Sequence, residues 1–177
     1  MIKIIYILII AFSSLPLKSN EDKIPFSFEN LSLKSSEKEK ILNFEVLSQS
    51  KVEDIDGEKK QKLHYKIMGL HKRTCMIALS KLSLYEKYSD FLDLITRSKY
   101  DKESQRLKLT LESLLLPFSM KLDFKIERMT DPGSYSFEFD KGFLKGLLGA
   151  IHISTYKNHC FFYSQIDWKG PHSGINS

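Results

Sequence analysis

The sequence of 177 residues has little of what disulfide-rich or metal-binding proteins require. It contains two cysteines, one tryptophan and five histidines. Two cysteines are too few to build a disulfide-stapled mini-protein, and neither Cys75 nor Cys160 belongs to a CxxC pair or a zinc-finger pattern. No two histidines stand four residues apart, as a helical metal site would require. The scattered histidines are His64, His71, His152, His159 and His172. The sequence therefore predicts no metal and no cofactor.

An excess of charge of one sign is also missing. Residues 1–19 contain Lys3 and Lys18, so their removal would leave 25 basic residues against 22 acidic ones, a net charge of +3. Along residues 121–128 the basic and acidic side chains alternate and do not gather into one patch. Because nucleic-acid binding draws its affinity from clustered Lys and Arg, we expect no nucleic-acid partner.

A long hydrophobic run occurs at the start of the chain. Residues 4–15 are mostly apolar and follow Lys3, which together form the n-region and h-region of a secretory signal. This run is shorter than the roughly 20 residues that span a bilayer, although an uncleaved anchor is the alternative. We therefore predict a signal peptide over residues 1–19 and an exported protein, either periplasmic or secreted.

The next part of the chain is polar. Residues 20–61 are expected to form a tether with a short helix at about residues 36–44, where serines and Glu37 resemble a helix start. Residues 52–61 hold many charged side chains and Gly57, which is typical of a solvated loop or a hairpin tip. One folded domain is expected over residues 62–170, followed by a short tail at residues 171–177.

Within this domain the dominant pattern has a period of two. In residues 118–127 every second residue is apolar, which is typical of a half-buried antiparallel strand. The same alternation recurs around Leu107, Tyr135 and Ile151, and a first strand spans residues 63–68 and ends at Gly69. From residue 74 to residue 94 the apolar spacing becomes three and four, which predicts two short helices with a break near Ser83. The expected fold is α+β, a curved antiparallel meander of about seven strands with two short helices after the first strand.

This order of elements resembles the helix-grip fold of the START/Bet v 1-like superfamily, also called the SRPBCC or polyketide cyclase/lipid-transport superfamily. The residues that carry the resemblance are the helical segment 75–94 with YEKYSDFL at 85–92, the strand SYSFEF around residues 134–139, GFLKGLLG at 142–149 and the strand that ends at Trp168. The resemblance covers roughly residues 62–170. It implies a protein that binds a lipid or another hydrophobic small molecule.

The chain departs from this superfamily at its C-terminus. A long helix normally closes the concave face of the sheet there, but residues 169–174 contain two glycines and a proline. The concave face is therefore expected to be open, or to be covered by the N-terminal helix or by a partner, either a protein or a membrane surface.

Apolar residues on the predicted concave face are candidates for ligand contacts, with an ordinary hydrophobic core as the alternative. The predicted ligand-binding residues are Leu109, Leu111, Met120, Leu122, Phe124, Phe137, Phe139, Ile151 and Phe162.

Catalysis has weaker support in the sequence. Acyl transfer would need a nucleophile elbow, and acid–base chemistry would need an inward carboxylate, and neither pattern occurs. The superfamily also contains cyclases and hydrolases, so an enzyme with Tyr135, Tyr163 or His64 as the proton donor is the alternative.

The helix-grip order has a consequence for the two cysteines. The first strand of that fold pairs with the last strand, which places the segment after the first strand near the turn at residues 157–159. Cys75 and Cys160 lie in these two places, and an exported protein reaches an oxidising compartment. We therefore predict a Cys75–Cys160 disulfide.

Overall fold

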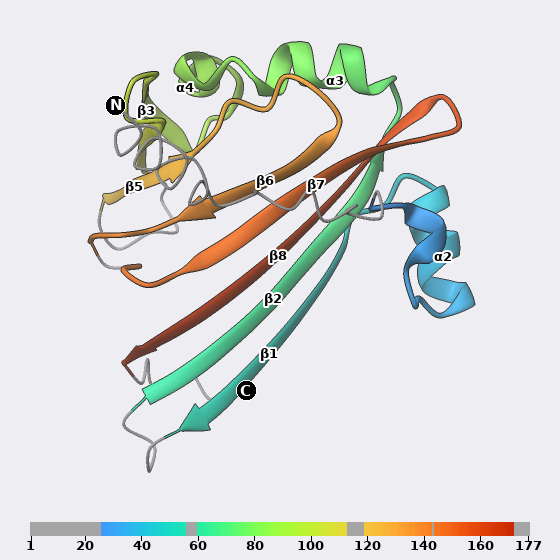
Figure 1. Ribbon diagram of the computed structural model, residues 1–177, viewed down its shortest axis with the longest axis horizontal. Helices are drawn as coiled ribbons and strands as arrows, with labels where there is room; N and C mark the ends of the chain where they lie inside the picture. Colours follow the sequence, from blue (N-terminus) through green and yellow to red (C-terminus); the bar gives the residue numbers. More distant parts are fainter. Residues whose placement is uncertain (1–25, 56–59, 113–118, 143, 172–177) are drawn as a thin grey trace, which may run out of the picture.

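The chain folds into one antiparallel sheet of eight strands (Figure 1). The computed structural model describes residues 26–55, 60–112, 119–142 and 144–171. Spatially the strands follow the order β1-β2-β8-β7-β6-β5-β4-β3, so β3 to β8 form a meander and β2 pairs with the last strand. The strands are β1 (Leu47–Ile55), β2 (Lys60–His71), β3 (Ile95–Asp101), β4 (Arg106–Leu111), β5 (Met120–Ile126), β6 (Gly133–Glu138), β7 (Leu148–Tyr156) and β8 (His159–Pro171). The α+β class and the pairing of the strand before the helices with the last strand are confirmed.

The additional strand is β1, in a stretch that the sequence analysis assigned partly to a loop. Residues 52–55 belong to β1 and residues 60–61 to β2, whereas residues 56–59, with Gly57, lie outside the described residues. β1 lies at the edge of the sheet, where charged side chains such as Lys51 and Glu53 reach solvent and discourage pairing with other chains. β2 also continues past Gly69 to His71, so the expected end of the first strand was wrong.

Two short helices follow β2, as predicted. They are α3 (Cys75–Leu82) and α4 (Tyr88–Phe91), with a 3₁₀ turn, η2 (Tyr85–Lys87), between them. Ser83 caps the end of α3, which confirms the predicted break. The buried side of α3 is formed by apolar residues three and four positions apart along the helix. These residues are Cys75, Ala78 and Leu79.

The N-terminal part contains a 3₁₀ turn, η1 (Phe28–Asn30), and the expected helix, α2 (Ser35–Leu42). The helix start differs in detail from the prediction, because its cap residue is Lys34 rather than a serine. The Glu37 carboxylate accepts a hydrogen bond from the Lys34 backbone N–H at 2.9 Å. This contact satisfies one of the N–H groups that a helix start leaves unpaired.

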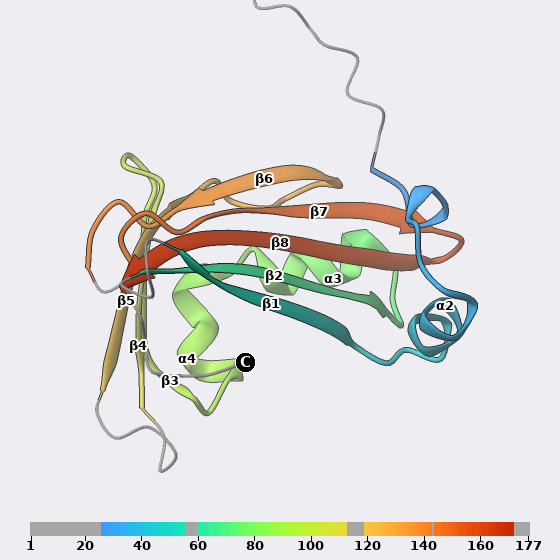
Figure 2. The same cartoon turned by 90° about the horizontal axis from the view of Figure 1, so that it is seen from below.

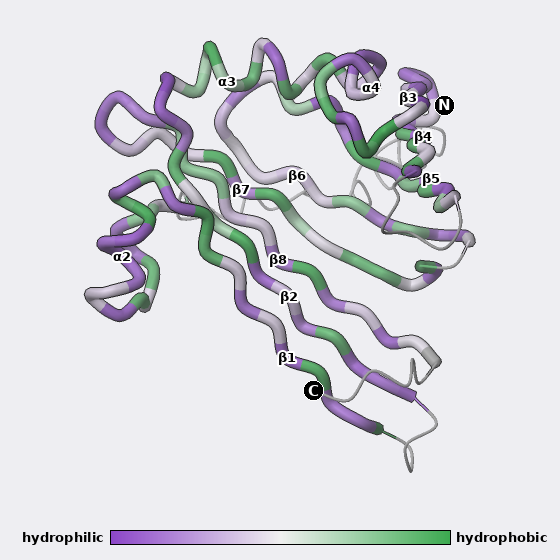
Figure 3. The backbone as a smooth tube through the Cα atoms, turned by 180° about the vertical axis from the view of Figure 1, so that it is seen from behind, coloured by the Kyte–Doolittle hydropathy of each residue, from purple (hydrophilic) through white to green (hydrophobic). Residues whose placement is uncertain are grey.

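The sheet curves around α3 and α4, which lie on its concave side (Figure 2). We call this side the inner face and define it by Leu107, Ile126, Ile153 and Cys160, which pack with buried residues of α3 and with Tyr85. Opposed residues on neighbouring strands share a face, and Ile153 lies opposite Phe162. Hydrophobic and hydrophilic residues alternate along the strands (Figure 3). Where apolar residues are consecutive in a strand, as Phe161 and Phe162 are in β8, they enter two different apolar clusters on opposite faces.

The second cluster lies on the opposite side, which we call the outer face. It joins Met68, Leu70, Phe161 and Tyr163 of the sheet to Phe28 and Ile41 of the N-terminal part. The N-terminal helix therefore packs against the outer face and does not cover the concave one. Residues 26–44 are packed structure here, whereas the sequence analysis assigned them to a tether with a short helix.

His152 lies opposite Tyr163 on the outer face of the sheet. Its ring is half-buried and stacks on Phe26, with ring centroids 4.6 Å apart. The Ser134 hydroxyl lies 2.7 Å from its Nδ1 atom. The outer face is therefore less polar at this position than the alternation implied, because the N-terminal segment covers it.

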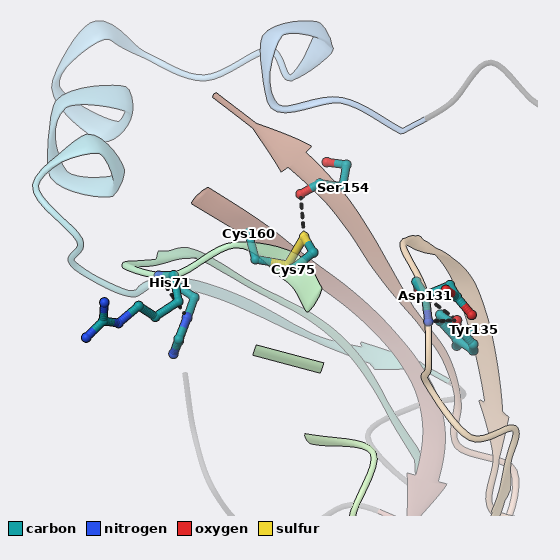
Figure 4. Close-up of a disulfide and its surroundings, with 7 residues drawn as sticks. His71, Cys75, Asp131, Tyr135, Ser154 and Cys160 are labelled. Atoms are coloured by element: carbon teal, nitrogen blue, oxygen red, sulfur yellow. Dashed lines mark hydrogen bonds between the residues drawn. A yellow bond between two sulfur atoms is a disulfide. The ribbon is translucent and has the colours of Figure 1, made fainter. Parts of the chain in front are cut away.

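The predicted disulfide is present. Cys75 begins α3 and Cys160 is the second residue of β8, and their Cα atoms are 4.5 Å apart (Figure 4). His71 of β2 lies opposite Cys160, so strand pairing brings the exit of β2 to the start of β8. The disulfide ties α3 to the sheet.

An ion-pair network crosses β4 and β5. Arg106 contacts Asp123 at 2.6 Å and Asp140 at 2.7 Å, while Lys125 and Lys141 lie 3.3 Å from Asp140 and 3.0 Å from Asp123, respectively. Arg106 and Asp123 thus form an ion pair between the neighbouring strands β4 and β5. Hydrogen bonds from the Arg106 guanidinium hold the pKa of Asp140 well below its usual range.

This pKa shift gives a prediction about acid unfolding. A carboxylate whose pKa is lowered in the folded state stabilises the protein above its unfolded pKa of about 4, and this contribution disappears as the pH falls toward the folded pKa. The free energy of unfolding should therefore fall less steeply below about pH 4 in Asp140→Asn than in the wild type. Urea titrations at several pH values measure this difference, and parallel curves for the two proteins would contradict it.

Candidate functional site

An apolar groove lies on the inner face, between strands β2, β7 and β8 and the end of α3. It has a volume of about 350 Å³. Its lining is formed by Val46, Ile67, Met68, Gly69, Leu70, His71, Leu82, Ile151, Phe162, Tyr163 and Ser164. The sheet side of the groove is formed by residues that the strand register places on one face. These residues are Ile67, Gly69, Phe162 and Ile151. The groove is partly open to solvent.

The sequence explains how each wall forms. On α3, Leu82 stands three residues after Leu79 and seven after Cys75, so it continues the buried stripe of the helix and reaches beyond it to the groove. Gly69 contributes no side chain at the inner face. A Cβ atom at this position would meet Val46 Cγ2 at 3.5 Å, an ordinary van der Waals contact. The glycine thus leaves space that a larger residue would fill.

Few polar groups reach the groove. His71 lies at one end, where its Nδ1 atom accepts a hydrogen bond from the Arg73 backbone N–H at 3.1 Å. A neutral ring held in this way carries its proton on Nε2. Tyr163 belongs to the outer cluster, and its hydroxyl donates to Gln165 Oε1 at 3.1 Å. The arrangement suits the burial of an apolar molecule better than bond-making chemistry.

Two of the nine predicted ligand-binding residues, Ile151 and Phe162, line this groove. The other seven lie toward β4, β5 and β6. Leu109 pairs with Leu122, and Leu111 with Met120, on the inner face. Phe124, Phe137 and Phe139 form a ring cluster with centroid separations of 4.6 to 6.4 Å. Three of the seven pack against the apolar cluster of the inner face, namely Leu109, Phe124 and Phe137, and Phe139 is buried.

The sequence analysis missed Val46, Ile67, Gly69 and Leu82 as groove residues. Ile67 continues the alternation of Leu63 and Tyr65, so its face could have been predicted from the first strand. Leu82 belongs to a clear helical stripe. Val46 precedes β1 and belongs to no periodic pattern, and its position depends on the pairing of β1 with β2.

The three candidate proton donors do not converge. Tyr135 lies opposite Ile151 on the inner side, and its hydroxyl donates to the Asp131 carbonyl at 2.7 Å (Figure 4). Tyr163 lies on the outer face, where burial raises the pKa of its hydroxyl. The His64 Nδ1 atom contacts the Asp167 carboxylate. Such separated groups give no shared acid–base site.

Two searches for other kinds of site concern the described residues alone. Across residues 26–55, 60–112, 119–142 and 144–171, no group of three or more His, Cys, Asp or Glu side chains is placed to hold a metal ion. In the same part of the chain, no helix has the length and apolar character needed to cross a membrane.

Comparisons with known proteins give structural neighbours without assigning a family. No family model and no curated protein sequence matches this chain. XoxI from Bacillus cereus is similar at 11% identity and a TM-score of 0.48, covering 64% of this chain and 78% of that one. CalU16 from Micromonospora echinospora has 9% identity and a TM-score of 0.43, with 69% and 68% of the two chains covered. A STAR-related lipid transfer protein from Xanthomonas axonopodis has 10% identity and a TM-score of 0.45, with 72% and 85% covered. These values are too low to assign a function.

Proposed function

We propose that this protein is an exported, START-like binding protein that holds one hydrophobic small molecule, such as a lipid, in the groove on its inner face. The observation that carries the proposal is the groove itself, about 350 Å³ in volume and lined mostly by apolar side chains. This volume lies near the lower end of the range of ligand pockets, which suits a single small ligand or one acyl chain. Burial of apolar surface would supply the affinity, at roughly 25 cal/mol per Å².

The open side of the groove shapes the expected binding. In the described part of the chain, the helical elements on the inner face are α3, η2 and α4, and the groove lies beyond Leu82 at the end of α3. A ligand there keeps part of its surface in water. We therefore expect the protein to bind its ligand with moderate affinity and to release it rapidly, as a carrier must. The groove does not enclose the ligand permanently.

Export is supported by two features. The first is the predicted signal over residues 1–19, which lies outside the described residues. The second is the Cys75–Cys160 disulfide, a bond that persists in oxidising compartments.

Native mass spectrometry after mild purification tests the binding proposal. A retained hydrophobic molecule of defined mass, lost on organic extraction, is the expected result. Failure to retain such a molecule, together with failure to bind a fluorescent hydrophobic probe, would contradict the proposal. A protein bound in stoichiometric amount would instead favour the alternative, an interaction module whose open groove holds a partner's helix.

Replacing Gly69 by leucine is expected to reduce binding of a hydrophobic probe at least tenfold. The new side chain would enter the groove, while its Cβ atom would make only ordinary contacts. Gly69→Ala is the matched control, because it adds one methyl group at the same place. Probe titration measures the affinity, and thermal melting checks the fold. Unchanged affinity in a folded Gly69→Leu protein would show that the ligand binds elsewhere.

A further inference from the structure

One end of the molecule combines exposed apolar and basic side chains. The segment after β2 and the tip of the β7–β8 hairpin meet there, at the right-hand end of the sheet in Figure 1. The Cys160 backbone N–H donates to the Arg73 carbonyl at 3.0 Å, and His159 Nδ1 lies 3.3 Å from the Lys72 carbonyl. The disulfide fixes the same junction. We call this surface the basic end and define it by Lys72, Arg73, Met76, Ile77 and Lys157.

The side chains of the basic end are available to a partner. Met76 is 79% exposed and Ile77 is 48% exposed, and both follow the disulfide on the first turn of α3. Lys72, Arg73 and Lys157 are exposed as well. Met76 exposes more of its surface than any other exposed large hydrophobic residue in the described part of the chain. Exposed apolar side chains of this kind mark interaction sites when they gather in one place.

Charge is distributed unevenly around these apolar side chains. Residues 71–84 include Lys72, Arg73 and Lys81 and contain no aspartate or glutamate. Two carboxylates lie on the flanks of the surface. Asp131 lines a hollow beside Met76, where its Oδ2 atom accepts a hydrogen bond from the Thr130 hydroxyl at 2.7 Å, and Glu45 follows Phe44 at the other flank. Between these two flanks, the basic end therefore carries positive charge.

Basic side chains around a small exposed apolar group are the pattern of an interfacial membrane contact. The apolar side chains enter the boundary between headgroups and acyl chains, and Lys and Arg attract anionic headgroups. The cations Lys72 and Lys157 lie over half-buried rings, those of Phe44 and Tyr156, at 5.6 and 5.5 Å. Rings beside cations suit the amphipathic level of the bilayer surface.

We propose that the basic end docks this protein onto the surface of an anionic lipid bilayer. His71 and Leu82, which border residues 72–81 on either side, also line the groove. Docking at this end would bring the groove close to the bilayer surface. The proposal goes beyond the binding of a ligand in the groove, and it can be tested whether or not a ligand is bound.

Vesicle flotation tests the proposal with two kinds of vesicle, one of phosphatidylcholine alone and one of phosphatidylcholine mixed with phosphatidylglycerol. The protein should float with the anionic vesicles at about 0.1 M salt and dissociate at about 1 M salt, where the Debye length falls to about 3 Å. Lys72→Glu/Arg73→Glu should weaken this binding at least tenfold, and Met76→Ser/Ile77→Ser should weaken it as well. The control is Lys99→Glu/Lys121→Glu, which changes the same charge at exposed positions on β3 and β5.

The outcomes separate docking from ligand binding. Gly69→Leu, which alters the groove, should float as the wild type does, and the two basic-end variants should still bind a soluble hydrophobic probe. Equal binding to neutral and anionic vesicles would overturn the proposal, as would no binding by a folded protein. Wild-type flotation by Lys72→Glu/Arg73→Glu, or an equal loss in the control variant, would also overturn it.

Discussion

Replacing both Cys75 and Cys160 by alanine is expected to lower the free energy of unfolding by about 4 kcal/mol. The bond joins residues 85 positions apart, so it removes a large loop-closure entropy from the unfolded chain. Both cysteines are almost fully buried, at 4% and 0% exposure, and alanine leaves only a small gap at each site. Urea unfolding of the oxidised wild type and the double-alanine variant measures the difference.

A reducing agent provides the control for this measurement. Reduction should destabilise the wild type by a similar amount and leave the double-alanine variant unchanged. A loss of less than about 1 kcal/mol in the variant would mean that the unfolded chain is already compact near these residues. We also expect weaker binding of a hydrophobic probe, because the disulfide holds α3 against β8 and Leu82 of α3 forms one wall of the groove.

Much of the sheet could be predicted because its strands alternate. In β5, for example, Leu122, Phe124 and Ile126 share one face while Lys121 and Lys125 share the other, so a shift of one residue would bury the charges. The disulfide was predicted from the pairing of the first strand with the last, which the resemblance to the helix-grip fold implies. β1 could not be predicted in this way, because an edge strand gains its partners from one side only and tolerates charge on both faces.

The groove was harder to predict than the strands. Alternation tells which residues share a face, but it does not tell which part of that face α3 covers. Phe124 and Phe162 lie on the same face, and yet Phe124 belongs to a ring cluster near β6 while Phe162 lines the groove. That division depends on the length of α3 and on its disulfide to β8, which are properties of the folded chain.

The N-terminal segment shows another limit of periodic patterns. Phe26 and Phe28 stand in a stretch with a proline and several polar residues, and no helical or strand period marks them as buried. In the structure Phe28 packs against Phe161 with ring centroids 5.1 Å apart, and Phe26 stacks on Tyr163 at 4.7 Å. The outer face is apolar at Met68, Leu70 and Phe161, and these residues determine where the segment packs.

Replacing Phe161 by alanine is expected to lower the free energy of unfolding by about 3–5 kcal/mol. The ring is fully buried between the outer face of β8 and the N-terminal segment, so its removal leaves a cavity bounded on both sides. Chemical denaturation measures the loss. Phe91→Ala serves as the control because the Phe91 side chain is 46% exposed, and we expect a loss below about 1 kcal/mol there.

A double-mutant cycle determines whether the N-terminal segment belongs to the cooperative fold. Phe28→Ala removes the other ring of the pair, whose planes meet at 64° in an edge-to-face contact. If both rings stabilise the same folded unit, the double variant should lose less than the sum of the single losses, by roughly 0.5–1.5 kcal/mol. Full additivity, with a small loss for Phe28→Ala alone, would mean that the segment detaches before the sheet unfolds. The tether predicted from the sequence would then describe the segment in solution better than its packed position does.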